Sequence, residues 1–136
     1  MKSVLAWIKT FIKTEWKVIT LERWYCMELY IGGRGQDKLN YVLKNRDIGK
    51  EQVWNKLHLW FLEKMKAGEQ PEEELRKYIR QHPDTVFISD EVGNGIVPLD
   101  PFEREYRERL GRMLTEIAAE AERVERVICG IGQRIK

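Results

Sequence analysis

From residue 27 onward, short apolar runs alternate along the chain with segments whose apolar residues recur at a helical spacing. This alternation is typical of α/β proteins, in which helices cover a sheet of mostly parallel strands. No internal repeat or low-complexity tract interrupts the pattern. A chain of 136 residues has room for one domain with a substantial core, and we expect residues 27–136 to form it.

The expected strands are short and apolar, which predicts a small sheet. They cover residues 27–31, 85–89 and 126–131, and the last residues, QRIK, either add a short fourth strand or fold back beside the third. The expected helices cover residues 38–45, 50–67, 71 to the position before Pro83, and 101–122. Gly68 is a typical residue to follow a helix, whereas Pro71 is suited to the first helical position.

The segment GGRGQDK at 32–38 resembles a phosphate-binding loop. In the pattern G-x-x-x-x-G-K-[ST], backbone N–H groups and the lysine hold phosphates, and the hydroxyl holds Mg²⁺. Gly32 and Lys38 have the required spacing, but Asp37 replaces the second glycine and Leu39 replaces the hydroxyl residue. A carboxylate repels phosphate, and leucine cannot bind magnesium. The motif alone leaves nucleotide binding and a plain glycine-rich turn open.

A second glycine-rich loop, DEVGNGIVP at 90–98, follows the apolar strand expected at 85–89. Open α/β sheets bind ligands just past the carboxyl ends of their strands. Acidic residues at that position hold Mg²⁺-bound water or a substrate hydroxyl, and a solvated turn is the alternative. We favour Glu91 over Asp90 for this role because Glu91 lies within the loop itself.

Composition limits the partners that we expect. The 24 basic and 22 acidic residues leave a net charge of +2, which is too small to predict binding of DNA or RNA. Cys26 and Cys129 provide neither a disulfide framework nor, with the two histidines, the usual four ligands of a zinc site. We therefore expect no metal site built from side chains alone and a cytoplasmic location.

Residues 1–26 combine tryptophan and aliphatic residues with four lysines. The lysines argue against a membrane span, and no cleavage signal follows the apolar residues. One interpretation is an amphipathic helix that lies on a membrane or docks on a partner, because residues 5, 8, 11 and 12 share an apolar face. We favour another, in which Met27 is the natural start, because the first strand and the phosphate loop follow it at once.

Three segments occur in a fixed order: ISDEVGNGIVP, FEREYRERLGRM and the terminal CGIGQRIK. Together with MELYIGG and Lys38, they resemble the family of adenosylcobinamide kinase/adenosylcobinamide-phosphate guanylyltransferases over nearly all of residues 27–136. The resemblance implies a P-loop NTPase fold of the RecA-like type, a three-layer α/β sandwich, and a homo-oligomer whose subunits share active sites. It also implies a role in cobalamin biosynthesis, where the family phosphorylates adenosylcobinamide and then transfers GMP to it through a histidine.

The resemblance assigns roles to particular residues. Lys38 would stabilise charge on the β- and γ-phosphates, and Glu91 would lie near the metal or the acceptor hydroxyl. The expected cofactors are GTP or ATP with Mg²⁺, and the expected substrate is a corrinoid. Arg107, Gly111 and Arg112 match a further family pattern. The residues implied to bind the nucleotide are Gly32, Gly33, Arg34, Gly35, Lys38, Gly93 and Gly95.

The chain departs from the family pattern between the two loops, where the guanylyl-accepting histidine stands in a His-x-x-Arg-Pro context. His58 lies instead in an apolar helical run, and we interpret it as a partly buried structural residue; His82 precedes Pro83. We therefore expect kinase-type activity rather than guanylyl transfer through histidine. The alternative is a catalytically inactive homologue that binds or regulates corrinoid enzymes, as the residues at 37 and 39 suggest.

Overall fold

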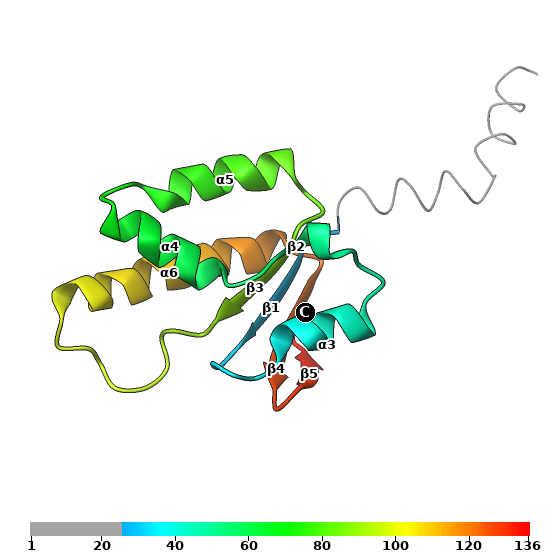
Figure 1. Ribbon diagram of the computed structural model, residues 1–136. Coiled ribbons are helices and arrows are strands. Elements are labelled where there is room, and N and C mark those ends of the chain that lie inside the picture. The colour runs from blue at the N-terminus through cyan, green and yellow to red at the C-terminus, as the bar shows by residue number, and fades with distance from the viewer. Residues whose placement is uncertain (1–25) are drawn as a thin grey trace, which may run out of the picture.

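A computed structural model of the chain describes residues 26–136, so the N-terminal extension expected at 1–26 lies outside the described residues except for Cys26. The sheet has five strands in the order β2-β3-β1-β4-β5 (Figure 1). All neighbouring pairs are parallel except β4 and β5. The strands are β1 (Glu28–Gly32), β2 (Val53–Trp54), β3 (Val86–Asp90), β4 (Arg123–Ile128) and β5 (Ile131–Arg134).

Four α-helices accompany the sheet in the described part of the chain: α3 (Lys38–Asn45), α4 (Leu57–Lys66), α5 (Pro71–Gln81) and α6 (Pro101–Glu120). Proline occupies the first turn of both α5 and α6, where its missing N–H costs no helical hydrogen bond. The Asp100 carboxylate caps α6 by accepting a hydrogen bond from the Phe102 N–H at 2.9 Å. None of the helices within residues 26–136 is long and apolar enough to cross a membrane.

The prediction of one helix over residues 50–67 is wrong for residues 50–56. Residues Lys50–Gln52 form a single 3-10 turn, and Val53 and Trp54 form the edge strand β2, which pairs with β3. Valine and tryptophan favour strands, and pairing with the open edge of β3 satisfies their backbone groups. The helix α4 begins only after Lys56, whose left-handed φ of 58° separates the strand from the helix.

The strand expected at 126–131 is also divided differently. β4 ends at Ile128, and β5 begins at Ile131 and runs antiparallel to it. Cys129 and Gly130 connect them with φ values of 51° and 73°. Two successive positive φ values are the requirement of a tight hairpin turn. The tail therefore adds a strand, which was one of the two outcomes that the sequence left open.

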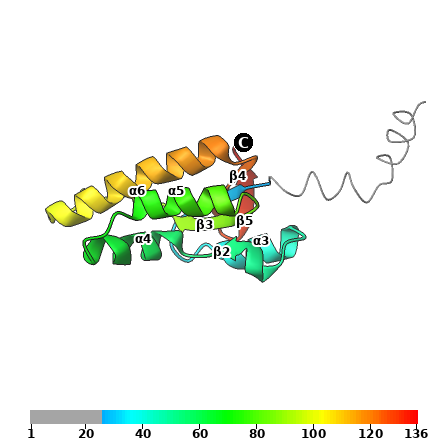
Figure 2. The same cartoon turned by 90° about the horizontal axis from the view of Figure 1, so that it is seen from above.

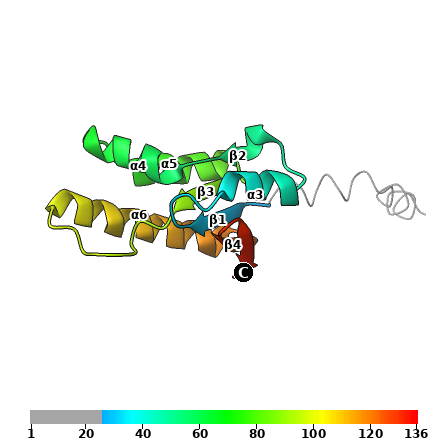
Figure 3. The same cartoon turned by 60° about the horizontal axis from the view of Figure 1, so that its bottom comes forward.

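Helices cover both faces of the sheet, so the expected three-layer α/β architecture is confirmed. Helix α3 packs on one face through an apolar cluster that includes Tyr30, Val42 and Ile88. The other face buries Leu29 and Phe87 against α4, α5 and α6. Figure 2 shows α3 and α6 on opposite sides of the strands, and Figure 3 shows α4 and α5 as neighbours.

The α3 face also contains buried charge at the start of β1. The Glu28 carboxylate accepts hydrogen bonds from Arg46 and from the Tyr30 hydroxyl, and the Tyr41 hydroxyl donates to Glu125 at 2.7 Å. Burial and the neighbouring Glu28 carboxylate raise the pKa of Tyr30. These pairs satisfy polar groups that would otherwise be costly to bury.

Candidate functional site

The two glycine-rich loops leave the sheet at the same place. Gly32, at the end of β1, and Asp90, at the end of β3, are partners in the parallel register. The Glu91 N–H then donates a hydrogen bond to the Gly32 carbonyl at 2.9 Å, which keeps the two loops together at their roots. The predicted phosphate loop and the predicted acidic loop therefore form one site at the carboxyl edge of the sheet, where α/β proteins bind ligands.

A close approach of β4 requires glycine at position 32, the start of the predicted phosphate loop. A Cβ atom at this position would lie 2.3 Å from the Val127 carbonyl oxygen, which is a backbone atom. Gly35, within the loop, has a φ of 74°, a conformation that glycine adopts at little cost. The sequence pattern and the local geometry thus agree for both glycines.

Asp37 occupies the last loop position before α3. Its φ of 60° is left-handed, as suits the glycine of the phosphate-loop pattern. The carboxylate makes no capping hydrogen bond to α3 and instead accepts one from the Asn40 side chain at 2.7 Å. The backbone conformation at this position therefore suits a glycine, whereas the side chain adds a negative charge to the loop.

The predicted phosphate loop is also held by hydrogen bonds to the β4–β5 turn. The Gln36 carbonyl accepts a hydrogen bond from the Gly130 N–H at 3.1 Å, and the Gln36 side-chain oxygen accepts one from the Cys129 N–H at 2.5 Å. Both donors lie in the two-residue hairpin turn. The chain end therefore supports the loop although the two segments are far apart in the sequence.

Lys38 points into the site from the first turn of α3. Its side chain is buried, with 7% exposed, and its Nζ lies 2.7 Å from Asp90 Oδ1 and 2.6 Å from the Gly33 carbonyl oxygen. The ammonium group is thus bound by one carboxylate and by loop carbonyl groups. With side-chain exposures of 7% and 20%, this ion pair is less screened by solvent than a pair of fully exposed side chains.

Glu91, which we favoured over Asp90 from the sequence, does not face Lys38. Its Oε2 lies 3.0 Å from Arg126 and accepts a hydrogen bond from the Asn94 side chain at 2.8 Å. Asp90 rather than Glu91 faces Lys38, although both acids line the same cleft. One feature of the sequence could have favoured Asp90. Alternate residues of a strand point to the same face, and Val86, Ile88 and Asp90 share the face that α3 covers.

His58 also reaches the site, from the first turn of α4. Its Nδ1 accepts a hydrogen bond from the Asp90 N–H at 3.1 Å, and its Nε2 lies 3.3 Å from Asp90 Oδ2. The His58 carbonyl accepts a hydrogen bond from the Tyr106 hydroxyl of α6 at 2.8 Å. Burial lowers the pKa of His58, although the Asp90 charge opposes this shift. The expected burial of His58 is confirmed, but its contact with the site was missed.

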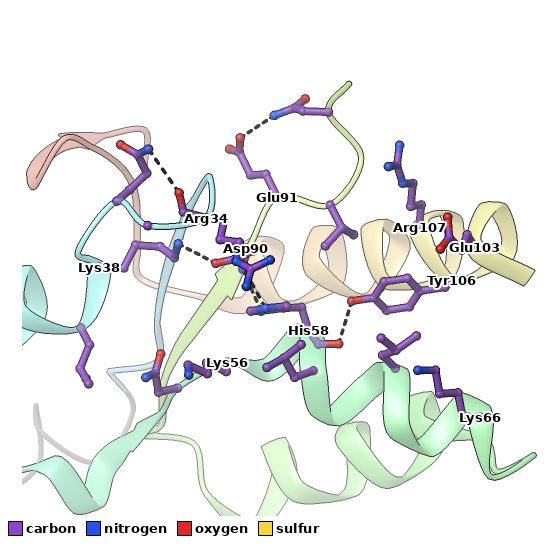
Figure 4. A pocket seen from close by; sticks show the side chains of 18 of the residues that line it. Arg34, Lys38, Lys56, His58, Lys66, Asp90, Glu91, Glu103, Tyr106 and Arg107 are labelled. Carbon is purple, nitrogen blue, oxygen red and sulfur yellow. Dashed lines mark hydrogen bonds and ion pairs between the residues drawn. The ribbon is translucent and has the colours of Figure 1, made fainter. Parts of the chain in front are cut away.

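These residues line an open cleft of about 1020 Å³ between the two loops and helices α4 and α6 (Figure 4). This volume is at the upper end of the range for small-molecule pockets. Leu59, Leu62 and Phe102 contribute apolar surface between the charged groups. The cleft is lined by both basic and acidic side chains; the basic ones are Arg34, Lys38, Lys56, Lys66 and Arg107, and the acidic ones are Asp37, Asp90, Glu91, Asp100 and Glu103.

The acidic loop is attached to α6 by arginines. The Arg107 guanidinium donates to the Ile96 carbonyl at 3.0 Å, and Arg104 donates to the carbonyls of Pro98 and Leu99 at 2.8 and 2.7 Å. Gly95 has a φ of 102°, so it shapes this loop. Gly93 and Gly95, which we expected to bind the nucleotide, do not line the cleft. Ile96 and Leu99 are more than nine-tenths exposed.

Comparison with known proteins identifies the relatives of this chain. Residues 36–135 match the family described as cobinamide kinase / cobinamide phosphate guanyltransferase. This match covers well over half of the chain. The chain belongs to this family. The bifunctional adenosylcobalamin biosynthesis proteins CobU of Salmonella typhimurium and of Escherichia coli are each 43% identical to it over 51 residues. That stretch covers 38% of this chain and 28% of either relative.

Membership of the cobinamide kinase / cobinamide phosphate guanyltransferase family raises the question of whether a metal ion fits the cleft. No cluster of three or more His, Cys, Asp or Glu side chains within residues 26–136 could hold one. Leu39 provides no oxygen ligand and packs in the cluster beneath α3. Mg²⁺ commonly binds through one or two carboxylates together with substrate phosphates and water. With a nucleotide that supplies the phosphate oxygens, the Asp90 carboxylate would be the one carboxylate ligand that such a Mg²⁺ site needs.

Proposed function

We propose that this chain binds GTP or ATP with Mg²⁺ in the cleft and transfers the terminal phosphoryl group to a hydroxyl of adenosylcobinamide. The observation that carries the proposal is the 2.7 Å contact between Lys38 Nζ and Asp90 Oδ1 at the ends of two neighbouring parallel strands. In P-loop NTPases, a lysine of the loop binds the β- and γ-phosphates, and an aspartate nearby holds Mg²⁺. The corrinoid acceptor is suggested by the family description and by the names of the two relatives.

Each group in the cleft has a role in this proposal. The backbone N–H groups of residues 33–35 and the Lys38 ammonium bind the phosphates, with Arg34 beside them. Asp90 holds Mg²⁺, which when bound neutralises charge on the phosphate oxygens. Glu91 lies at the start of the acidic loop and lines the cleft, where it would orient the acceptor hydroxyl. Catalysis then rests on positioning and on electrostatic stabilisation of the charge that develops on the phosphoryl oxygens.

Lys38 exchanges partners in this scheme. Without a nucleotide, its ammonium is bound by Asp90 and by the Gly33 carbonyl. With a nucleotide bound, phosphate oxygens would replace the carbonyl as acceptors for Lys38, and Asp90 would be the residue that holds the metal ion. The Lys38 ammonium would keep charge-assisted hydrogen bonds after this exchange, with phosphate oxygens among the acceptors.

We do not include guanylyl transfer through histidine. Nδ1 of His58 accepts a hydrogen bond from the Asp90 N–H, and its Nε2 lies 3.3 Å from Asp90 Oδ2. His82 stacks on Tyr78 with a ring-centroid distance of 4.2 Å at the end of α5 and does not line the cleft. The proposal is therefore limited to the kinase half-reaction, in a homo-oligomer in the cytoplasm.

A second candidate function has its own observation. The Asp37 carboxylate lies at the N-terminal end of α3, beside the loop N–H groups that would bind phosphate. Its charge weakens binding of an anion there. If binding is abolished, the chain acts instead as an inactive partner of a corrinoid enzyme.

Isothermal titration of the full chain with GTP and with ATP, in Mg²⁺, tests the proposal. We expect a Kd in the micromolar range, about −8 kcal/mol. Turnover with adenosylcobinamide is then measured by the appearance of phosphorylated corrinoid. Absence of binding at millimolar nucleotide would reject the kinase proposal and favour the inactive partner.

A further inference from the structure

Gln36 lies in the middle of the predicted phosphate loop, and the kinase scheme gives it no role. It is partly buried, whereas the other residues from 33 to 37 are exposed. The turn between β4 and β5 lies beside this loop, which joins β1 to α3 (Figure 1). Gln36 is the loop residue that contacts the turn, through both its main chain and its side chain.

The two contacts fix the orientation of the Gln36 side chain. The Gly130 N–H donates to the Gln36 main-chain carbonyl at 3.1 Å, and the Cys129 N–H donates to Oε1 of the side chain at 2.5 Å. Only the oxygen of a carboxamide can accept a hydrogen bond from an N–H group, so the oxygen faces Cys129. The Nε2 group then faces the other way, 3.5 Å from the Arg34 carbonyl oxygen. Gln36 therefore connects the turn to the loop residues before it.

The hairpin that provides these donors is itself packed against α3. The Tyr41 hydroxyl of α3 donates to Glu125 of β4 at 2.7 Å. A Cβ atom at Gly132 of β5 would lie 2.1 Å from the Tyr41 hydroxyl oxygen, so glycine at this position leaves room for the tyrosine. The hairpin thus has a fixed place beside the helix that begins with Lys38, and it can serve as a support for the loop.

The hydrogen bonds within the predicted phosphate loop use its acceptors and leave its donors unused. Four carbonyl groups accept hydrogen bonds, those of Gly32, Gly33, Arg34 and Gln36. In contrast, the backbone N–H groups of residues 33–37 donate to no residue of the described part of the chain. A row of unused N–H groups is suited to an anionic ligand.

The contact with the turn also determines where one of these donors points. The peptide bond between Gln36 and Asp37 is trans, so its C=O and N–H groups point in opposite directions. The Gly130 N–H holds the Gln36 carbonyl toward the turn. The Asp37 N–H is therefore directed away from the turn, where no described residue accepts its hydrogen bond.

We propose that Gln36 is a positioning residue that fastens the predicted phosphate loop to the β4–β5 turn and so keeps its unused N–H groups arranged for phosphate oxygens. Without the side-chain contacts, the N–H groups of residues 33–35 have more freedom, and a ligand must order them when it binds. The role in phosphate binding rests on the proposed function, whereas the attachment of the loop to the turn does not.

Replacing Gln36 by methionine removes both side-chain contacts with little change in size. We expect Gln36→Met to weaken binding of Mg²⁺·GTP and of Mg²⁺·tripolyphosphate by the same factor, about tenfold, in titration calorimetry. Gln133→Met is the matched control, because Gln133 is exposed on β5 and does not line the cleft.

Tripolyphosphate separates positioning from direct contact, because Gln36 also lines the cleft. A loss of GTP affinity without a loss for tripolyphosphate would mean that Gln36 contacts the nucleoside, and it would overturn the proposal. Affinities in Gln36→Met equal to those of Gln133→Met would overturn it as well.

Nuclear magnetic resonance of the chain without nucleotide separates this inference from the kinase proposal. We expect hydrogen exchange of the Cys129 N–H to be about tenfold faster in Gln36→Met and the amide resonances of residues 33–35 to shift. Gln36→Glu keeps the acceptor, so it should keep the Cys129 N–H protected. If the parent binds neither ligand but shows these changes, the kinase proposal fails and the attachment of the loop stands. Unchanged exchange at Cys129, or unchanged resonances of residues 33–35, would overturn the attachment itself.

Discussion

The side chains of Lys38 and Asp90 meet across two parallel strands, with Nζ 2.7 Å from Oδ1. Lys38 begins the helix that follows β1, whereas Asp90 ends β3, so the pair exists only because β1 and β3 are neighbours in the sheet. The pair places a cation and a carboxylate at one point of the cleft.

Replacing Lys38 by methionine tests the phosphate role of the lysine. We expect GTP affinity to fall about tenfold to a hundredfold, because charge-assisted hydrogen bonds to phosphate contribute about 1.5–3 kcal/mol. Titration calorimetry with Mg²⁺ measures the change. Lys44→Met is the matched control, because Lys44 is exposed on the same helix. Unchanged affinity in Lys38→Met would remove the lysine from the site.

Replacing Asp37 by glycine should strengthen nucleotide binding. The substitution removes a carboxylate beside the phosphate loop and suits the φ of 60° at this position. We expect GTP affinity to rise about tenfold and the free energy of unfolding to stay equal or rise by about 1 kcal/mol. Asp47→Gly, in the connection after α3, controls for the general effect of losing a negative charge. Weaker binding in Asp37→Gly would show that the carboxylate assists the ligand.

Replacing Gly32 by alanine should destabilise the fold. The added Cβ would meet the Val127 carbonyl oxygen at 2.3 Å, so β1 and β4 must separate. We expect the free energy of unfolding to fall by about 1–3 kcal/mol, as for other overpacked sites. Thermal unfolding followed by circular dichroism measures this loss. Gly93→Ala is the control, because its Cβ would meet no atom within 4 Å; similar losses in both variants would contradict the prediction.

Acidification should destabilise the protein through His58. Burial lowers the pKa of this ring in the folded state below its ordinary value of 6.5, so the unfolded chain binds a proton more readily. The free energy of unfolding therefore falls as the pH drops below about 6.5, and the His58 contribution levels off below the lowered pKa. Chemical denaturation between pH 5 and pH 8, compared for the parent and His58→Gln, measures it. The parent should lose more stability than the variant, and parallel curves would contradict the assignment.

Most helices and strands follow from local chemistry. Pro71 and Pro101 start their helices, and the apolar residues before Asp90 form a strand, as the sequence predicts. Val53 and Trp54 fit a helical spacing equally well, and they become a strand because the open edge of β3 lies beside them. Their conformation depends on a partner that is distant in the sequence, which no local pattern contains.

The amino-acid sequence by itself determined most of the helices and strands, the two glycine-rich loops and the membership of a family. Tertiary structure alone decided which acid faces Lys38. Alternate residues of a strand point to opposite faces, so the identity of the inward acid depends on which face α3 covers. Tertiary structure also brought His58 to the site, because α4 packs at the end of β3 and this contact places the His58 ring beside Asp90.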